Sequence, residues 1–239
     1  MLDRVSGRGL IAMLAALAFF PAVAQNGEQP TVVGAPAELN RRFVDPELDV
    51  EEWVERFEGE SREVFAARHD ILRATGVRAG ERVADIGAGT GLYTRLFAEE
   101  VGSSGRVYAV EIGPRFLEHI NRTTADAGLT NVTAVLGRID SVTLPAESVD
   151  LAFLCDTYHH LEAVKPTLAS IHSALAPGGR LVVIDFERIP GRSREWILEH
   201  TRAGKDESRL EIEAAGFAFV GEVEIPGFEE NYFLKFKKK

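Results

Sequence analysis

The side chains with the clearest chemical potential surround a glycine-rich segment that follows an apolar run. Asp85 precedes three closely spaced glycines, Gly87, Gly89 and Gly91, and Ala88 lies between the first two. Glycine adopts positive φ angles and lets a ligand approach the main chain. A carboxylate at such a loop repels a pyrophosphate but accepts hydrogen bonds from a ligand that carries an ammonium group. The pattern therefore predicts a site for a positively charged nucleoside ligand.

A second acidic residue supports this interpretation. Glu111 ends the apolar segment 106–111 and lies about 20 residues beyond the glycine loop, the spacing at which a carboxylate accepts hydrogen bonds from ribose hydroxyls. The glycines are spaced G-x-G-x-G, and Leu92 occupies the place where the dinucleotide fingerprint has its third glycine. A dinucleotide-dependent oxidoreductase is therefore the less favoured alternative.

Three further polar residues follow the apolar segment 148–155. Asp156, His159 and His160 lie where a central parallel strand would end, and ligands of open α/β sheets bind beyond the carboxyl ends of the strands. Histidine titrates near pH 7 and is suited to act as a general base. These residues are our candidates for catalysis, and the alternative is that the histidines pack against the scaffold or contact a cofactor.

The same residues also offer atoms that could bind a metal ion. Adjacent histidines on one turn rarely face the same ion, and the sequence contains no other His or Cys cluster that would complete a tetrahedral set. We therefore expect no metal site.

The segment Asp-x-Gly-x-Gly-x-Gly resembles motif I of the class I S-adenosylmethionine-dependent methyltransferases. The segment 140–145, Asp-Ser-Val-Thr-Leu-Pro, and the turn at 175–179, Leu-Ala-Pro-Gly-Gly, resemble later motifs of this family and follow in the family's order. The resemblance implies S-adenosylmethionine as cofactor, Glu111 at its ribose and Asp140 beside its adenine. The implied cofactor site comprises Asp85, Gly87, Ala88, Gly89, Gly91, Glu111 and Asp140.

The resemblance also implies an architecture. We expect an α/β, Rossmann-like fold with a seven-stranded, mostly parallel sheet, an antiparallel edge strand and helices on both faces. The expected methyltransferase domain covers residues 49–239, with a helical cover over 49–79 and the core over 80–239. Residues 25–37 are rich in Gly, Pro, Gln and Ala, with little periodicity, and we expect residues 25–48 to be flexible.

The helical cover has an alternative interpretation. Apolar residues recur at helical spacing between 49 and 74, which indicates an amphipathic cover packed on the sheet. It could instead form a lid over the cofactor, with Arg62 or Glu58 reaching the site.

The implied function is methyl transfer to an unidentified small-molecule acceptor. The alternative is a non-catalytic protein that binds an adenosyl ligand and retains the fold.

The amino-terminal 24 residues have the features of a secretory signal peptide. Arg4 and Arg8 precede the apolar run 10–20, and a small-x-small site places cleavage after Ala24. The run is shorter than the ~20 residues of a membrane span, so no stable membrane insertion is expected after cleavage. The alternative is an uncleaved amino-terminal membrane anchor. The sequence thus predicts export, with a periplasmic location, although the methyl donor is made in the cytoplasm.

Charge and composition limit the partners. The net charge of −10 disfavours nonspecific binding of nucleic acid, and the length of 239 residues fits one domain with appendages. His200, Arg202 and Lys205 form a basic group that suits an anionic acceptor, although a solvated helix explains them equally well. The oligomeric state is not indicated by the sequence.

Overall fold

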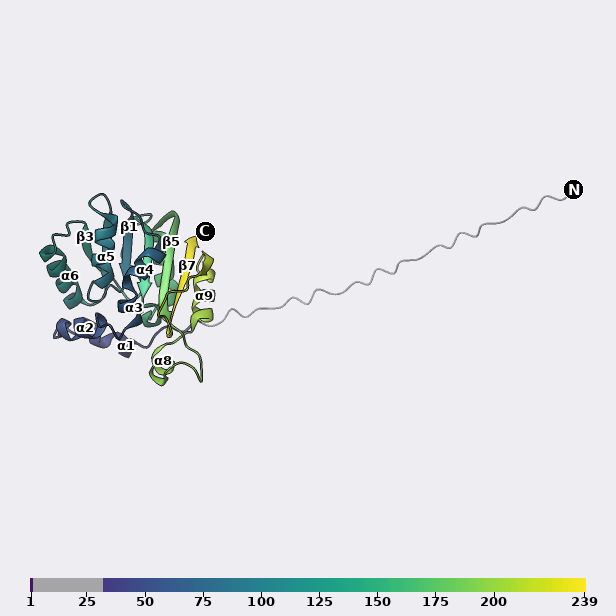
Figure 1. Ribbon diagram of the computed structural model, residues 1–239, viewed down its shortest axis with the longest axis horizontal. Helices are drawn as coiled ribbons and strands as arrows, with labels where there is room; N and C mark the ends of the chain where they lie inside the picture. The colour runs from purple at the N-terminus through teal and green to yellow at the C-terminus, as the bar shows by residue number, and fades with distance from the viewer. Residues whose placement is uncertain (2–31) are drawn as a thin grey trace. The chain divides into compact units, whose positions relative to one another are not determined.

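The computed structural model describes Met1 and residues 32–239. Residues 32–239 form one compact unit, in which helices surround a central sheet (Figure 1). The predicted signal peptide lies outside the described residues and stays a prediction. The elements are α1 (Ala37–Arg41), η1 (Arg42–Val44), α2 (Val50–Phe57), α3 (Glu63–Ala66), α4 (Arg68–Thr75), β1 (Arg82–Ile86), α5 (Leu92–Val101), β2 (Arg106–Glu111), α6 (Pro114–Asp126), β3 (Val132–Leu136), β4 (Val149–Cys155), η2 (Tyr158–His160), α7 (Val164–Ala174), β5 (Leu175–Phe186), α8 (Glu195–His200), α9 (Lys205–Ala214), β6 (Phe217–Glu222) and β7 (Asn231–Lys238).

The sheet has seven strands in the order β3-β2-β1-β4-β5-β7-β6. The strands β1 to β5 pair in parallel, whereas β7 is antiparallel to both β5 and β6. The last two strands therefore form the antiparallel edge, and the predicted Rossmann-like fold class is confirmed.

The strand order reverses between β1 and β4. These strands are neighbours in parallel register, with Ile86 opposite Leu154, yet the chain forms β2 and β3 between them. A ligand of an open α/β sheet binds at such a switch point, beyond the carboxyl ends of the strands. The fold thus places the segments that follow β1 and β4, including Gly87 and Asp156, at the expected ligand site.

Apolar side chains on both faces of the central strands form the core. On one face, Leu154 and Val183 pack in a cluster with residues of α7 and α9, and on the other Phe153 packs with Phe97 of α5. Burial on both faces explains why β4 is a nearly continuous apolar run. The core thereby fixes the strand ends that carry the polar residues.

α1 and α2 lie at the same end of the unit as α8 (Figure 1). Asp49 caps α2 by accepting a hydrogen bond from the Glu51 N–H. Phe43 of η1 and Trp53 of α2 pack on each other, with ring centroids 5.0 Å apart, and on Phe116 of α6. The sequence predicts no regular structure over 25–48, whereas the chain forms α1 and η1 there. The aromatic contacts hold η1, and the Asn40 side chain of α1 donates to the His160 carbonyl and to Glu162.

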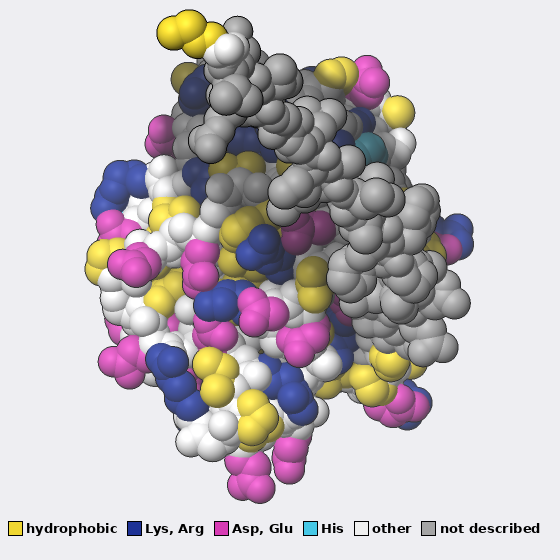
Figure 2. Space-filling view, turned by 90° about the vertical axis from the view of Figure 1, so that its right-hand side faces the viewer, with side chains coloured by type: hydrophobic (Ala, Val, Ile, Leu, Met, Phe, Trp, Pro, Cys, Tyr) yellow, Lys and Arg dark blue, Asp and Glu magenta, His cyan; other side chains and the backbone are white. Residues whose placement is uncertain are grey.

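The surface of the described unit is mixed in charge. On the face shown in Figure 2, acidic and basic side chains are interspersed wherever atoms are not drawn in grey. Within residues 32–239, no helix is both long enough and apolar enough to cross a membrane.

Candidate functional site

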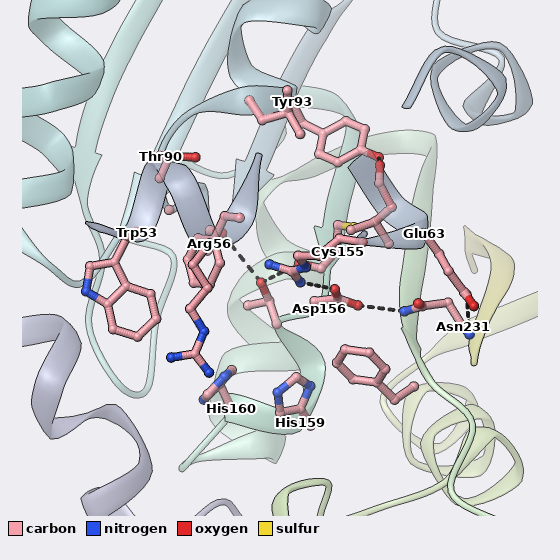
Figure 3. Close-up of a pocket in the computed structure, with 18 of the residues that line it drawn as sticks. Trp53, Arg56, Glu63, Thr90, Tyr93, Cys155, Asp156, His159, His160 and Asn231 are labelled. Atoms are coloured by element: carbon pink, nitrogen blue, oxygen red, sulfur yellow. Dashed lines mark hydrogen bonds and ion pairs between the residues drawn. The ribbon is translucent and has the colours of Figure 1, made fainter. Parts of the chain in front are cut away.

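Two adjoining cavities lie beyond the carboxyl ends of β1 and β4. The larger has a volume of about 740 Å³ and is lined by the glycine loop, by residues of η1 and α2, and by residues of α8 (Figure 3). The smaller, of about 130 Å³, is lined by Glu111 and by apolar side chains such as Val110 and Phe116. Gly87, Gly89 and other residues line both cavities, so one glycine loop serves the two compartments.

The glycine loop takes a conformation that other residues rarely adopt. Gly87, Gly89 and Gly91 have φ angles of 69°, 52° and 80°. The N–H groups of Gly87 and Ala88 both donate to the carbonyl oxygen of Val110, which ties the loop to β2. A Cβ on Gly87 would lie 2.3 Å from Thr157, so glycine is also required sterically.

Glu111 organises this loop from the end of β2. Its carboxylate accepts hydrogen bonds from the N–H groups of Gly89 (2.9 Å), Ile112 (2.7 Å) and Gly113 (3.0 Å). Burial raises the pKa of Glu111, and the three N–H groups offset part of this effect. A carboxylate has about four acceptor positions, so Glu111 can still accept a hydrogen bond from a ligand in the smaller cavity.

Asp85 is buried beneath the larger cavity. Its carboxylate accepts a hydrogen bond of 2.6 Å from the Thr94 hydroxyl. Burial raises the pKa of Asp85 from 3.8 to about 7, and the nearby charge of Glu111 adds to the shift. Because the ionised form is costly to bury, a cationic ligand in the cavity would favour it.

The pKa of Asp85 predicts a dependence of stability on pH. The folded protein holds this proton up to about pH 7, whereas the unfolded chain loses it near its ordinary pKa of 3.8. The contribution to folding is therefore complete at low pH and is lost as the pH rises through 7. We expect the wild-type chain to lose more unfolding free energy than Asp85→Asn between pH 5 and pH 8, measured by urea denaturation. Equal losses in both proteins would show that Asp85 keeps an ordinary pKa.

Asp156 lies at the turn after β4 with a positive φ of 48°. Its carboxylate forms an ion pair with Arg62 and accepts a hydrogen bond of 2.7 Å from the Asn231 side chain (Figure 3). The α3–α4 region thus reaches the site through Arg62, as the lid interpretation proposes. Glu58 instead binds Arg95, whose guanidinium also donates to the Thr90 carbonyl in the glycine loop.

His159 and His160 both line the larger cavity. The buried carboxylate of Asp185 accepts hydrogen bonds from the His159 main-chain N–H (2.9 Å) and ring Nδ1 (2.6 Å), which fixes the ring. Burial lowers the pKa of His160 to about 2, so its ring stays neutral and holds a proton weakly. The catalytic roles of both histidines and of Asp156 stay predictions.

Two other groups lie differently from the sequence expectations. Asp140 forms an exposed ion pair with Arg138 (3.0 Å) and is absent from the residues that line the cavities, although its neighbours Ile139 and Ser141 line the smaller one. Of the basic group, only His200 lines the larger cavity; Arg202 pairs with Glu211, and Lys205 pairs with two glutamates.

Sequence reasoning missed several residues of the larger cavity. Arg42 and Phe43 come from the segment expected to be flexible, and Trp196 comes from α8. These residues lie far from the glycine loop along the chain, so the sequence does not show that they are close to it in space. The amphipathic spacing around Trp53 was the only signal that pointed to this wall.

Comparisons with known proteins agree with this geometry. Residues 84–183 match the family profile described as "Methyltransferase domain". Residues 84–183 therefore form a methyltransferase domain. This domain includes the glycine loop, Glu111 and the segment after β4.

Curated relatives of the methyltransferase domain have different stated activities. A ubiquinone/menaquinone biosynthesis C-methyltransferase, UbiE, from Marinomonas sp. (strain MWYL1) is 34% identical over 122 residues, which are 51% of this chain and 48% of the relative. A protein-L-isoaspartate O-methyltransferase from Aeropyrum pernix is 31% identical over 68% of this chain and 58% of the relative. The chain thus spans about half the length of the curated relatives it matches.

Solved structures share the methyltransferase fold. A SAM-dependent methyltransferase from Aquifex aeolicus matches with a TM-score of 0.70 and 24% identity, covering 81% of this chain and all of that chain. The [4+2]-cyclase SpnF matches with a TM-score of 0.62 and 16% identity over 72% of this chain and 80% of that chain. At these identities, the likeness concerns the fold alone.

The cofactor of this methyltransferase family, S-adenosylmethionine, fits the residues present. The smaller cavity combines apolar side chains, which suit a purine, with the Glu111 carboxylate, which suits ribose hydroxyls. The larger cavity adjoins it at Gly87 and Gly89 and contains Asp85, a carboxylate that suits a cationic sulfonium and its amino group. The donor and acceptor chemistry of the site therefore matches this cofactor from the purine to the sulfonium.

Proposed function

We propose that this protein transfers the methyl group of S-adenosylmethionine to a small, anionic, aromatic acceptor. The observation that supports the proposal most directly is the division of the site. The glycine loop and Asp85 line one end of the larger cavity, next to Glu111 in the smaller cavity, whereas the other end of the larger cavity is lined by aromatic and basic side chains. Cofactor and acceptor can thus lie in adjoining parts of one space.

The acceptor end favours a flat, negatively charged molecule. The guanidinium of Arg42 lies 4.9 Å from the Trp53 ring centroid, and that of Arg56 lies 5.1 Å from the same ring. Burial and the positive charge of Arg56 lower the pKa of Arg42, so the two cations stand close to each other. An anion between them would relieve their repulsion, and the aromatic rings would stack on a conjugated acceptor.

The names of the curated relatives suggest a chemical class for the acceptor but do not identify the acceptor. The name of the UbiE relatives specifies C-methylation in quinone biosynthesis, and these proteins are matched over only about half their length. An oxygenated aromatic acceptor with an acidic hydroxyl or carboxylate would suit both that chemistry and the arginine-lined wall.

S-adenosylmethionine supplies an electrophilic methyl group on its sulfonium sulfur. The chain contributes alignment: Glu111 and the glycine loop would orient the nucleoside, while Arg42, Arg56 and Trp53 would hold the acceptor. The Arg62–Asp156 ion pair anchors the helical cover to the turn after β4, which limits the access of water. Alignment of this kind supplies much of the acceleration of a bimolecular transfer.

A labelled-methyl assay tests this function. We expect the chain to transfer label from methyl-labelled S-adenosylmethionine to members of a panel of hydroxylated aromatic carboxylates, and much less to their methyl esters. Arg42→Gln combined with Arg56→Gln is expected to raise the KM of the carboxylates about 10-fold or more and to leave that of the esters unchanged, because each lost charge-assisted contact contributes ~1.5 kcal/mol or more.

Arg115→Gln is the matched control, because Arg115 is a half-exposed residue of α6 that pairs with Glu118 and lines neither cavity. Cofactor binding without transfer to any acceptor would favour the non-catalytic alternative. Equal transfer to acids and esters would contradict the anionic acceptor.

A further inference from the structure

Three of the six histidines of the chain meet at the acceptor end of the larger cavity. His159 and His160 come from η2, and His200 comes from the last turn of α8. One nitrogen from each ring lies within 4.8 Å of the others. The ring centroids are 4.2 Å (159–160), 5.0 Å (159–200) and 5.2 Å (160–200) apart.

The ring of His159 is held in the manner of a metal ligand. Its Nδ1 binds the carboxylate of Asp185 at 2.6 Å, and Asp185 is itself fixed by the N–H groups of His159 and Phe186. Histidine ligands of metal ions commonly donate their second ring N–H to a buried carboxylate, which sets the tautomer and the ring orientation. Nε2 of His159 is therefore left as an acceptor with a free lone pair.

A ring nitrogen of His160 is also left without a partner. His160 Nδ1 is buried and has no hydrogen-bond partner among the described residues, an arrangement that is costly unless something binds the ring. The rings of His159 and His200 are its neighbours, with centroids 4.2 Å and 5.2 Å away, so one ligand shared by the three rings could satisfy it.

We propose that His159, His160 and His200 bind one divalent transition-metal ion of the zinc type. Imidazole nitrogen suits Zn²⁺ and its neighbours, and three histidines with one open position are a known arrangement for zinc. Zn–N bonds of ~2.1 Å in a tetrahedral site place the ligand nitrogens ~3.4 Å apart, so small side-chain rotations from the observed spacing would close the site.

The surroundings indicate what would occupy the fourth position. Three neutral imidazoles leave the charge of the ion uncompensated, and Arg42 and Arg56 add positive charge in the same cavity. An anionic oxygen therefore suits the open position better than a neutral ligand does. If the proposed function holds, the carboxylate or phenolate of the acceptor would be that ligand. The metal site itself does not depend on methyl transfer.

A titration with Co²⁺ and Zn²⁺ tests the site. Full-length protein without a polyhistidine tag is titrated with Co²⁺ in the absence of S-adenosylmethionine, and its visible absorption is recorded; Zn²⁺ is then added in competition. We expect one saturable site whose spectrum indicates tetrahedral coordination and is abolished by Zn²⁺. His200→Gln is expected to weaken binding about 100-fold or more, because replacing even a residue that only supports a ligand costs 10–100-fold.

His69→Gln is the matched control, since His69 is an exposed residue of α4 outside the cluster. It is expected to bind Co²⁺ as the wild type does, and circular dichroism establishes that both variants fold. The absence of a saturable site in the folded wild-type protein would overturn the proposal. Unchanged affinity in His200→Gln would do the same. Because no cofactor is present, failure of the methyltransferase assay would leave this result intact.

Discussion

Replacing Glu111 with alanine is expected to weaken S-adenosylmethionine binding about 100-fold. A hydrogen bond to a charged group contributes ~1.5–3 kcal/mol, so the loss of one ribose contact alone weakens binding by about 10- to 150-fold. The variant also removes the acceptor of the Gly89, Ile112 and Gly113 N–H groups, which loosens the glycine loop. Isothermal titration calorimetry with S-adenosylmethionine measures the effect.

Two further variants identify the cause of the effect. Glu111→Gln keeps the size of the side chain and one carbonyl acceptor, so its affinity should lie between those of the alanine variant and the wild type. Glu118→Ala, an exposed position on α6, should bind as the wild type does. Wild-type affinity in Glu111→Ala would mean that the nucleoside does not lie against β2.

Gly87→Ala is expected to destabilise the protein by about 2–5 kcal/mol and to reduce cofactor binding. The left-handed conformation of a residue with a Cβ costs ~1–2 kcal/mol, and overpacking typically costs ~1–3 kcal/mol more. Here the new Cβ would lie 2.3 Å from Thr157 Cγ2, so the turn after β4 must move away from the loop after β1. Urea denaturation and calorimetric titration measure the two effects.

Gly76→Ala separates strain from crowding. Gly76 has a φ of 67°, close to the 69° of Gly87, but a Cβ there meets nothing within 4 Å. Its cost should therefore be only the ~1–2 kcal/mol of the conformation. Adding Thr157→Ala to Gly87→Ala should recover part of the lost stability, because only the Thr157 Cβ, at 3.0 Å, then remains close. Equal costs at both glycines would show that the contact with Thr157 is unimportant.

The sequence predicted the parts of the site that lie at the ends of central strands. Asp85, the glycines and Glu111 lie at the ends of apolar runs. Parallel pairing of β1 with β2 and β4 brings the carboxyl ends of these strands together at one edge of the sheet, whatever the other side chains are. Local spacing was therefore enough to predict both the loop and the carboxylate opposite it. The fold class followed from the same alternation of strands and helices.

The remainder of the site depends on tertiary contacts that spacing does not encode. Asp140 has the motif position expected for an adenine contact, yet an ion pair with Arg138 holds it at the surface. α7 and β5 separate His200 from His160 along the chain, and α8 brings the His200 ring next to the rings of the other two histidines. We expected no metal site because adjacent histidines rarely face one ion and the sequence has no other His or Cys cluster; the packing of α8 brings a nitrogen of His200 within 4.8 Å of nitrogens of the other two histidines.

The wall formed by Phe43, Trp53 and Arg42 was hidden for a related reason. Low periodicity predicted a flexible segment before residue 49, whereas aromatic contacts with Phe116 of α6 order η1 and α2. Short helices of this kind are stabilised mainly by packing rather than by intrinsic propensity, so they leave a weak signal in the sequence.

The central claim is that the paired cavities accept a sulfonium nucleoside. The most direct measurement is a calorimetric titration of the wild-type chain with S-adenosylhomocysteine and, in parallel, with NAD⁺. We predict saturable binding of one S-adenosylhomocysteine per chain in the micromolar range and no heat from NAD⁺. If the folded protein does not bind S-adenosylhomocysteine, or binds NAD⁺ in its place, the cavities do not form a site for a sulfonium nucleoside.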